Sequence, residues 1–194
     1  MTAPTSAERR DVTARLTVLA AKRMANMTPY WATEVDLDMG KMHRVDLMGF
    51  VPLGSPTGSD VSRVEGGTFV CCEVKSCMND FNSGHGLNFW GDQNWLVCPK
   101  ALADEVRGNL PLGVKLMVLC PDAGGRRLVM RYDLSGPHAL HRTQPASVMM
   151  FALLRAIKNG RGDGNADGYG APRGGGEAAR CGGWISPPRK GMGT

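Results

Sequence analysis

The order of apolar and polar stretches predicts an α/β or α+β domain on a single mixed β-sheet. A helix-like segment opens the chain, three strand-like runs follow it, and strands and helices alternate after a polar linker. The third run, within residues 67–77, is apolar on both faces, as expected for a central strand that is covered from both sides. With 194 residues, the chain is long enough for one domain with a substantial core.

The first elements are a helix and a pair of strands. Residues 7–27 carry apolar side chains at helical spacing, and Ser6 before them is a suitable N-cap. Residues 28–38 and 42–51 are strand-like, and a turn around Gly40 separates them. Because the second strand follows at once, the two predict a hairpin.

A long connection leads into the central strand. Residues 52–66 are rich in Gly, Pro and Ser, which predicts a loop longer than the usual few residues. After the central strand, residues 80–92 are polar and glycine-rich but contain several large apolar side chains. We expect a short irregular helix in this segment.

The second half of the domain alternates strands and helices. Residues 93–99 predict a strand that ends in proline, and residues 100–108 predict a helix that stops at a glycine. Residues 114–120 and 127–133 predict two further strands joined by a glycine-containing turn. Residues 145–159 predict a final amphipathic helix.

Composition divides the chain into a domain of residues 1–159 and a tail of residues 160–194. The tail contains 12 of the 26 glycines and has no apolar periodicity, so we expect it to be flexible. Its net charge is +2 of the total of +5. A basic balance of this size is compatible with a polyanionic partner, although solvated surface lysines are the simpler explanation.

The cysteines favour a reduced, intracellular protein. None of them forms a C-x-x-C pair, and most lie in apolar runs, where free cysteine packs as a small hydrophobe. Their spacing does not converge on a zinc site. The first residues have no apolar core, and no run approaches transmembrane length, so we expect a cytoplasmic protein without membrane contact. The cysteines are Cys71, Cys72, Cys77, Cys98, Cys120 and Cys181.

Two charged residues end the apolar run G-T-F-V-C-C-E-V-K-S-C. Period two in a strand places Glu73 and Lys75 on the same face, beyond Phe69 and Cys71. Burying an unpaired charge is costly, so these two residues either pair with each other or take part in chemistry. Taken alone, an exposed ion pair worth ~0–1 kcal/mol is the simpler interpretation.

Acidic residues on the two preceding strands change that balance. Asp46 interrupts the apolar part of its strand, where aspartate is unfavourable, and Glu34 does the same one strand earlier. Neighbouring strands lie about 4.8 Å apart, so their carboxylates can converge on one cation. Mg²⁺ (or Mn²⁺) suits such a site, since Mg²⁺ takes a few carboxylates and keeps several waters.

The constellation predicts a hydrolytic metal site. Asp46 and Glu73 would hold the ion, and the backbone carbonyl of Val74 would add an oxygen. Glu34 would be an outer or second-metal ligand, or would orient a water. The metal would polarise a phosphate and lower the pKa of a bound water. Lys75 would position or deprotonate that water and offset charge on the phosphoryl oxygens.

The residues and their order resemble the PD-(D/E)XK nuclease superfamily, and more closely its small MmcB-like and phage-encoded branch. The matching motifs, in order, are T-E-V at Glu34, H-R-V-D ending in Asp46, E-V-K-S at residues 73–76, D-F at residues 80–81 and W-L-V-C-P at residues 95–99.

The resemblance implies a restriction-endonuclease-like α-β-β-β-α-β core on a mixed central sheet. It implies that Asp46, Glu73 and Lys75 are the metal and catalytic residues, with Glu34 as a fourth. Asp80 and Phe81 would be structural or would flank the active site. His85 could contact phosphate, although a solvated histidine is the simpler interpretation.

The expected function is metal-dependent hydrolysis of DNA phosphodiesters, of endonuclease type. The settings would be DNA repair, recombination or phage DNA metabolism in a bacterial host, with DNA as the partner. The alternative is a catalytically inactive nuclease-fold protein that binds nucleic acid or a protein partner, as an accessory or inhibitor factor. Met149 and Met150 of the last helix could extend an interface, and a homodimer stays an open alternative.

Overall fold

The computed structural model describes residues 6–37, 44–54, 62–111, 113–137 and 141–162. The expected turn around Gly40, the cysteine Cys181 and nearly all of the expected tail lie outside these residues. The strands are β1 (Trp31–Asp36), β2 (Arg44–Val51), β3 (Thr68–Val74), β4 (Gln93–Val97), β5 (Leu116–Pro121) and β6 (Leu128–Asp133). The helices are α1 (Ser6–Met27), α2 (Ser62–Glu65), α3 (Met78–Asn82), α4 (Lys100–Val106) and α5 (Ala146–Ala156), with short helical turns η1 (Arg107–Asn109) and η2 (Ile157–Arg161).

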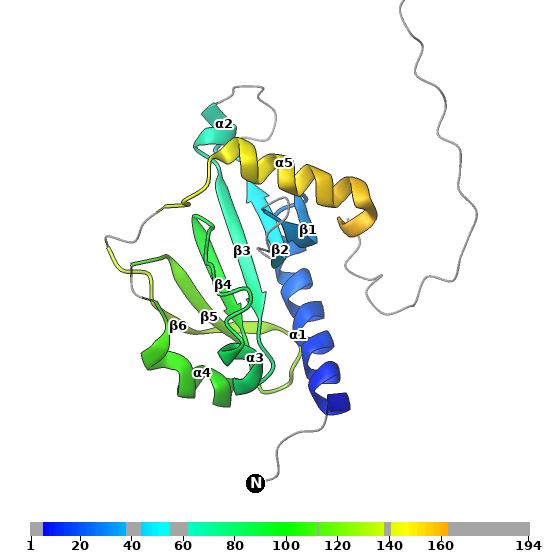
Figure 1. The fold of residues 1–194 in the computed structure, drawn as a ribbon, viewed down its shortest axis with the longest axis vertical. Helices are drawn as coiled ribbons and strands as arrows, with labels where there is room; N and C mark the ends of the chain where they lie inside the picture. Colours follow the sequence, from blue (N-terminus) through cyan, green and yellow to red (C-terminus); the bar gives the residue numbers. More distant parts are fainter. Residues whose placement is uncertain (1–5, 38–43, 55–61, 112, 138–140, 163–194) are drawn as a thin grey trace, which may run out of the picture.

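The strands form one six-stranded mixed sheet in sequence order, β1 to β6 (Figure 1). The first three strands are antiparallel neighbours, β3, β4 and β5 are parallel, and β6 returns antiparallel to β5. In β3 every residue after Thr68 is buried, as the two-sided apolar pattern predicted. The prediction of a mixed α/β fold on a single sheet is confirmed.

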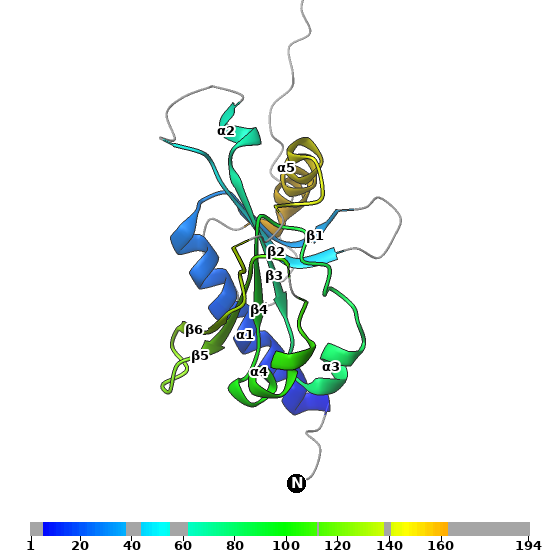
Figure 2. The same ribbon diagram turned by 90° about the vertical axis from the view of Figure 1, so that its left-hand side faces the viewer.

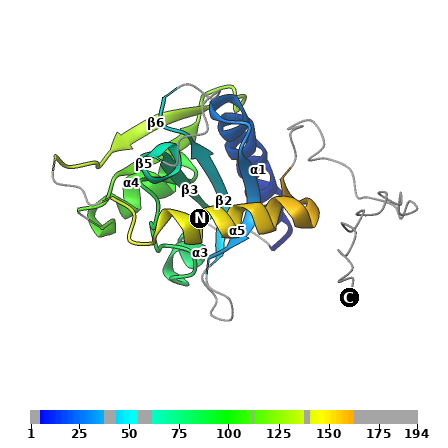
Figure 3. The ribbon, with the colours of Figure 1, turned by 90° about the horizontal axis from the view of Figure 1, so that it is seen from above.

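Helices cover both faces of the sheet. The long helix α1 packs on one face, where its apolar side chains meet Val70 and Cys72 of β3. On the opposite face, α5 packs over Phe69 and Cys71. The apolar side chains of α4 lie against β4 and β5. Figures 2 and 3 show α1 and α5 on opposite sides of the sheet.

The five described cysteines are free, and four of them are buried. Cys71 and Cys72 belong to the cores on opposite faces of β3. The prediction that these two cysteines serve packing is confirmed. Among the described residues, no helix combines the length and the apolar character needed to cross a membrane.

Three local differences from the expected elements were found. The segment expected as a loop over residues 52–66 contains the single helical turn α2. The short helix expected within residues 80–92 starts earlier, as α3. At the end of α5, η2 continues the fold to Arg161, two residues past the expected limit of the domain. Gly160 has a φ of 72°, which turns the chain back toward β1.

Candidate functional site

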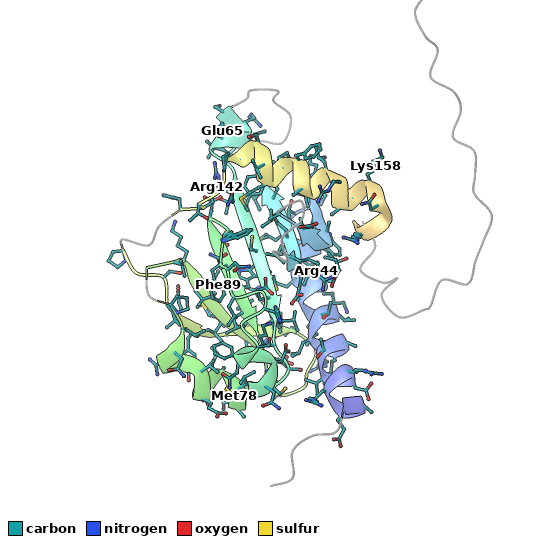
Figure 4. The ribbon with its side chains drawn as sticks, viewed as in Figure 1. Arg44, Glu65, Met78, Phe89, Arg142 and Lys158 are labelled. Carbon is teal, nitrogen blue, oxygen red and sulfur yellow. The ribbon has the colours of Figure 1, made fainter. Side chains whose placement is uncertain are left out.

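One cavity of about 840 Å³ lies where β3 ends, and every site residue named from the sequence lines it. Besides Glu34, Asp46, Glu73, Val74 and Lys75, the wall has residues from α1, β1, β2, α3, the segment after α3, and η2. The additional residues are Thr13, Thr17, Asp36, Arg44, Asp80, His85, Gly86 and Arg161. Arg44, labelled in Figure 4, belongs to this wall and lies at the start of β2.

The strand register brings the first two carboxylates together. In the antiparallel pair of β2 and β3, Leu47 lies opposite Cys72, and one further step places Asp46 opposite Glu73. Asp46 Oδ2 also accepts a hydrogen bond of 2.8 Å from the backbone N–H of Val74. In an extended strand the N–H and C=O of one residue point to the same side, so we expect the Val74 carbonyl to face β2 as well.

Burial makes these carboxylates hard to ionise. Glu73 is only 3% exposed, and its burial, with the negative charge of Asp46 beside it, raises its pKa to about 10. Burial also raises the pKa of Asp46, against the Val74 N–H and the charges of Lys75 and Arg44, which lower it. Oε1 of Glu73 is buried without a hydrogen-bond partner. Within the described residues, the nearby charges of Lys75 and Arg44 do not offset the burial of Glu73, and its Oε1 stays unsatisfied.

The donor set fits Mg²⁺ or Mn²⁺. Within the described residues, no group of three or more His, Cys, Asp or Glu side chains is arranged to hold a metal. The carboxylates of Asp46 and Glu73 line the cavity together with Val74, whose carbonyl is the predicted third donor. Oxygen donors of this kind, few in number, suit a hard cation that keeps several waters, and the unpartnered Oε1 marks where one would bind.

Lys75 is buried at the same place. It is 4% exposed, and its backbone N–H donates to Val97 O at 2.9 Å, which continues the β3–β4 pairing one residue past the strand. Its ammonium donates to the backbone carbonyl of His85 and lies 3.7 Å from Asp80 Oδ1. Its charge lowers the pKa of both neighbouring carboxyls, although burial outweighs this effect.

Glu34 lies on the cavity wall in a different arrangement. Its φ of 54° is in the left-handed region, which is unusual for a glutamate. In the register of β1 with β2, Thr33 and Val35 have partners on β2, but none is given by the pairing for Glu34 between them. Its carboxylate pairs with Arg44 at 2.7 Å, and its carbonyl accepts a hydrogen bond of 2.7 Å from Arg161. Glu34 therefore holds two arginines at the cavity, and its role as a metal ligand stays a prediction.

Sequence reasoning missed Gly86, whose backbone covers Glu73. Gly86 has a φ of 78°, and a Cβ built on it would lie 2.2 Å from Oε2 of Glu73. Only glycine fits there without displacing the carboxylate. A glycine-rich segment with polar residues signalled a special loop, but nothing in the pattern linked this position to Glu73.

The comparisons with known proteins add no function. No family model matches the chain, and no curated protein matches its sequence. Among solved structures, the fold is similar to the SPO1766 protein of unknown function from Silicibacter pomeroyi, at 18% identity and a TM-score of 0.47. The alignment covers 77% of this chain and 85% of that chain.

Proposed function

We propose that the protein is a metal-dependent nuclease of the PD-(D/E)XK type that hydrolyses DNA phosphodiesters. The observation that carries the proposal is the convergence of Asp46, Glu73 and Lys75 on one cavity, with Oε1 of Glu73 buried and unpartnered. A buried carboxyl, a half-buried one and a buried ammonium placed together are expensive for a purely structural site. A cation and a phosphate between them would complete the charge balance.

The order of elements supports the same proposal. The chain runs α1, β1, β2, β3, α3, β4, with the short turn α2 between β2 and β3. This order matches the α-β-β-β-α-β core that the sequence resemblance implies. The candidate residues also take the positions expected from it, on β2 and at the end of β3.

Asp46, Glu73 and Lys75 have separate roles in the proposed reaction. Asp46 and Glu73 would hold Mg²⁺ or Mn²⁺, which when bound supplies Lewis-acid polarisation of a phosphate and activation of a water. Lys75 would place its ammonium against the phosphoryl oxygens and offset the charge that develops on them. It would also orient the attacking water.

The cavity wall offers contacts for a polyanion. Arg44 and Arg161, both held by Glu34, line it beside the carboxylates. Guanidinium groups bind phosphate oxygens with two parallel hydrogen bonds, so this pair would fix the DNA backbone on the side of β1 and β2. Glu34 would then act by orienting the arginines or a water.

Cleavage assays test the proposal. Branched, single-stranded and duplex DNA would be incubated with the protein in EDTA, Mg²⁺ or Mn²⁺. We expect metal-dependent cleavage that Glu73→Gln abolishes and that Lys75→Ala reduces to a low residual rate. Glu105→Gln and Lys100→Ala are matched controls, because both residues lie exposed on α4, away from the cavity, and should leave cleavage unchanged. Absence of cleavage on every substrate, or equal cleavage by all four variants, would refute the enzymatic function.

A second candidate function rests on the outer face of α5. Phe151 and Leu154 are 64% and 55% exposed, and Val148 lies on the same helix face one turn earlier. Exposed apolar side chains at this spacing favour binding of a protein partner, which is the role expected of a catalytically inactive member. This candidate predicts no cleavage, together with unchanged partner binding in Glu73→Gln and loss of binding in Phe151→Ser.

A further inference from the structure

The ammonium of Lys75 is fixed by the segment that follows it in the chain. Lys75 leaves β3 at the cavity, and its Nζ meets two acceptors, the carbonyl of His85 and the carboxylate of Asp80. Both acceptors come from residues 76–86, which turn through α3 and return to the cavity. Residues 76–86 thus fold back over Lys75, the residue that precedes them in the chain.

Asp80 is itself held rigidly. Its Oδ2 accepts a hydrogen bond of 3.0 Å from the backbone N–H of Ser76 and lies 3.4 Å from the hydroxyl of the same residue. Its other oxygen, Oδ1, therefore remains directed at the ammonium of Lys75. The next residue, Phe81, is buried in the core beside α4, which anchors the turn.

The return of the segment depends on glycines. Gly84 and Gly86 have φ values of 70° and 78°, and they flank His85 on both sides. Two left-handed residues in this short stretch turn the chain so that the His85 carbonyl accepts a hydrogen bond from the Lys75 ammonium while Gly86 packs on Glu73. The segment therefore contacts Lys75 and Glu73 at the same time.

We propose that Asp80 is a positioning residue, which with the His85 carbonyl holds the Lys75 ammonium in the place where it meets the phosphoryl group. This role rests on the proposed function, in which Lys75 is the catalytic lysine that Asp80 would hold in place. A free lysine side chain samples many rotamers, and ordering it costs conformational entropy. Fixing it before substrate binds removes that cost from the reaction step, where a displacement of about 1 Å can cost about a hundredfold in rate.

Chemical labelling of the metal-free protein tests the positioning directly. The protein would be treated with limiting acetic anhydride, and acetylation of each lysine followed by mass spectrometry. Lys75 should react much more slowly than the exposed Lys100 and Lys158. Asp80→Asn keeps the shape and the acceptor for Ser76 but removes the charge, so it should increase the labelling of Lys75 severalfold. Asp104→Asn, in an exposed ion pair with Arg131, should not.

Kinetics test the consequence for catalysis. Asp80→Asn should lower kcat about ten- to a hundredfold, with KM and the calorimetric affinity for Mg²⁺ unchanged. In the Lys75→Ala background the same substitution should have no further effect, because the group that it positions is gone. A purely structural role would instead lower stability and act equally in both backgrounds.

The outcomes separate this inference from the proposed function. If the native protein cleaves no DNA, the proposed function fails, and the labelling experiment still decides whether Lys75 is held. If cleavage occurs but Asp80→Asn leaves kcat unchanged, or its effect adds fully to that of Lys75→Ala, the positioning role is refuted. Labelling of native Lys75 at the rate of Lys100 refutes it without any variant.

Discussion

The carboxylate of Asp46 on β2 accepts the backbone N–H of Val74 at 2.8 Å, at the last residue of β3. Backbone pairing between the two strands ends at Leu47 and Cys72. A side chain therefore replaces the backbone acceptor at the point where the strands separate around the cavity. The same contact orients Asp46 beside Glu73 and satisfies a buried donor, so one residue joins the fold to the candidate site.

Two substitutions at Asp46 should separate these roles. Asp46→Asn keeps an oxygen that can accept the Val74 N–H, whereas Asp46→Ala leaves that donor unpaired in a buried strand end. We expect Asp46→Ala to be about 1–3 kcal/mol less stable than Asp46→Asn in urea denaturation with EDTA. Both variants should lose Mg²⁺ binding in calorimetry. Equal stability of the two variants would show that water satisfies the Val74 N–H.

Stability without metal should fall as pH rises. The pKa of Glu73 is raised from 4.5 to about 10 in the folded protein. Between these values the folded state binds a proton that the unfolded state has lost, so stability is highest below the unfolded pKa and is lost as pH rises toward the folded one. Chemical denaturation in EDTA from about pH 5 to about pH 9 should show this decline.

A neutral variant and the metal provide the controls for that decline. Glu73→Gln removes the titrating group, so its stability should vary less with pH than that of the native protein. Mg²⁺ binds the deprotonated carboxylates, so it should stabilise the native protein most at high pH and release protons on binding. A native profile as flat as that of Glu73→Gln would contradict the burial of an uncompensated carboxyl.

The sequence was sufficient for the strands and for the central part of the site. Period two placed Glu73 and Lys75 at the end of a strand buried on both faces, and the structure shows both residues buried there. The interruption of an apolar strand by Asp46 carried the second signal. These residues line one cavity because neighbouring strands follow one another in the chain, so their pairing is local in sequence.

Contacts made by backbone atoms, or between residues far apart in the chain, could not be predicted from the sequence pattern. The carbonyl of His85 binds Lys75 whatever side chain His85 carries. Arg161 reaches Glu34 across 127 residues, and composition alone assigned it to the tail. The left-handed φ of Glu34 arises from tertiary contacts, since a glutamate has no intrinsic preference for it. Local pattern cannot encode these features.

The buried ion pair at the opposite end of β3 should be critical for stability. Arg142 donates to both oxygens of Asp92 at 3.0 and 2.8 Å and to the carbonyl of Gly67 at 3.1 Å. Figure 4 labels Arg142 close to Glu65, whose carbonyl it also contacts. Arg142→Ala leaves the buried carboxylate of Asp92 with only the exposed His141, 3.7 Å away, so we expect a loss of about 3–5 kcal/mol in urea denaturation.

An exposed pair supplies the control for Arg142. Arg131 contacts Asp104 at 2.9 Å on the surface, where solvent screens the pair, so Arg131→Ala should lower stability far less than Arg142→Ala. Both substitutions remove the arginine partner of one aspartate. The difference between the two losses of stability therefore measures the effect of burying the ion pair. Similar losses for the two variants would show that water reaches Asp92.

Gly86 and Gly84 offer a matched pair for the loop over Glu73. Both have a left-handed φ, so alanine at either position should cost about 1–2 kcal/mol of stability. A Cβ at Gly84 meets nothing within 4 Å, whereas at Gly86 it would lie 2.2 Å from Oε2 of Glu73. Gly86→Ala should therefore also weaken Mg²⁺ binding in calorimetry, and Gly84→Ala should not. Equal Mg²⁺ affinity in the two variants would mean that the loop can move away from Glu73 without disturbing the carboxylates.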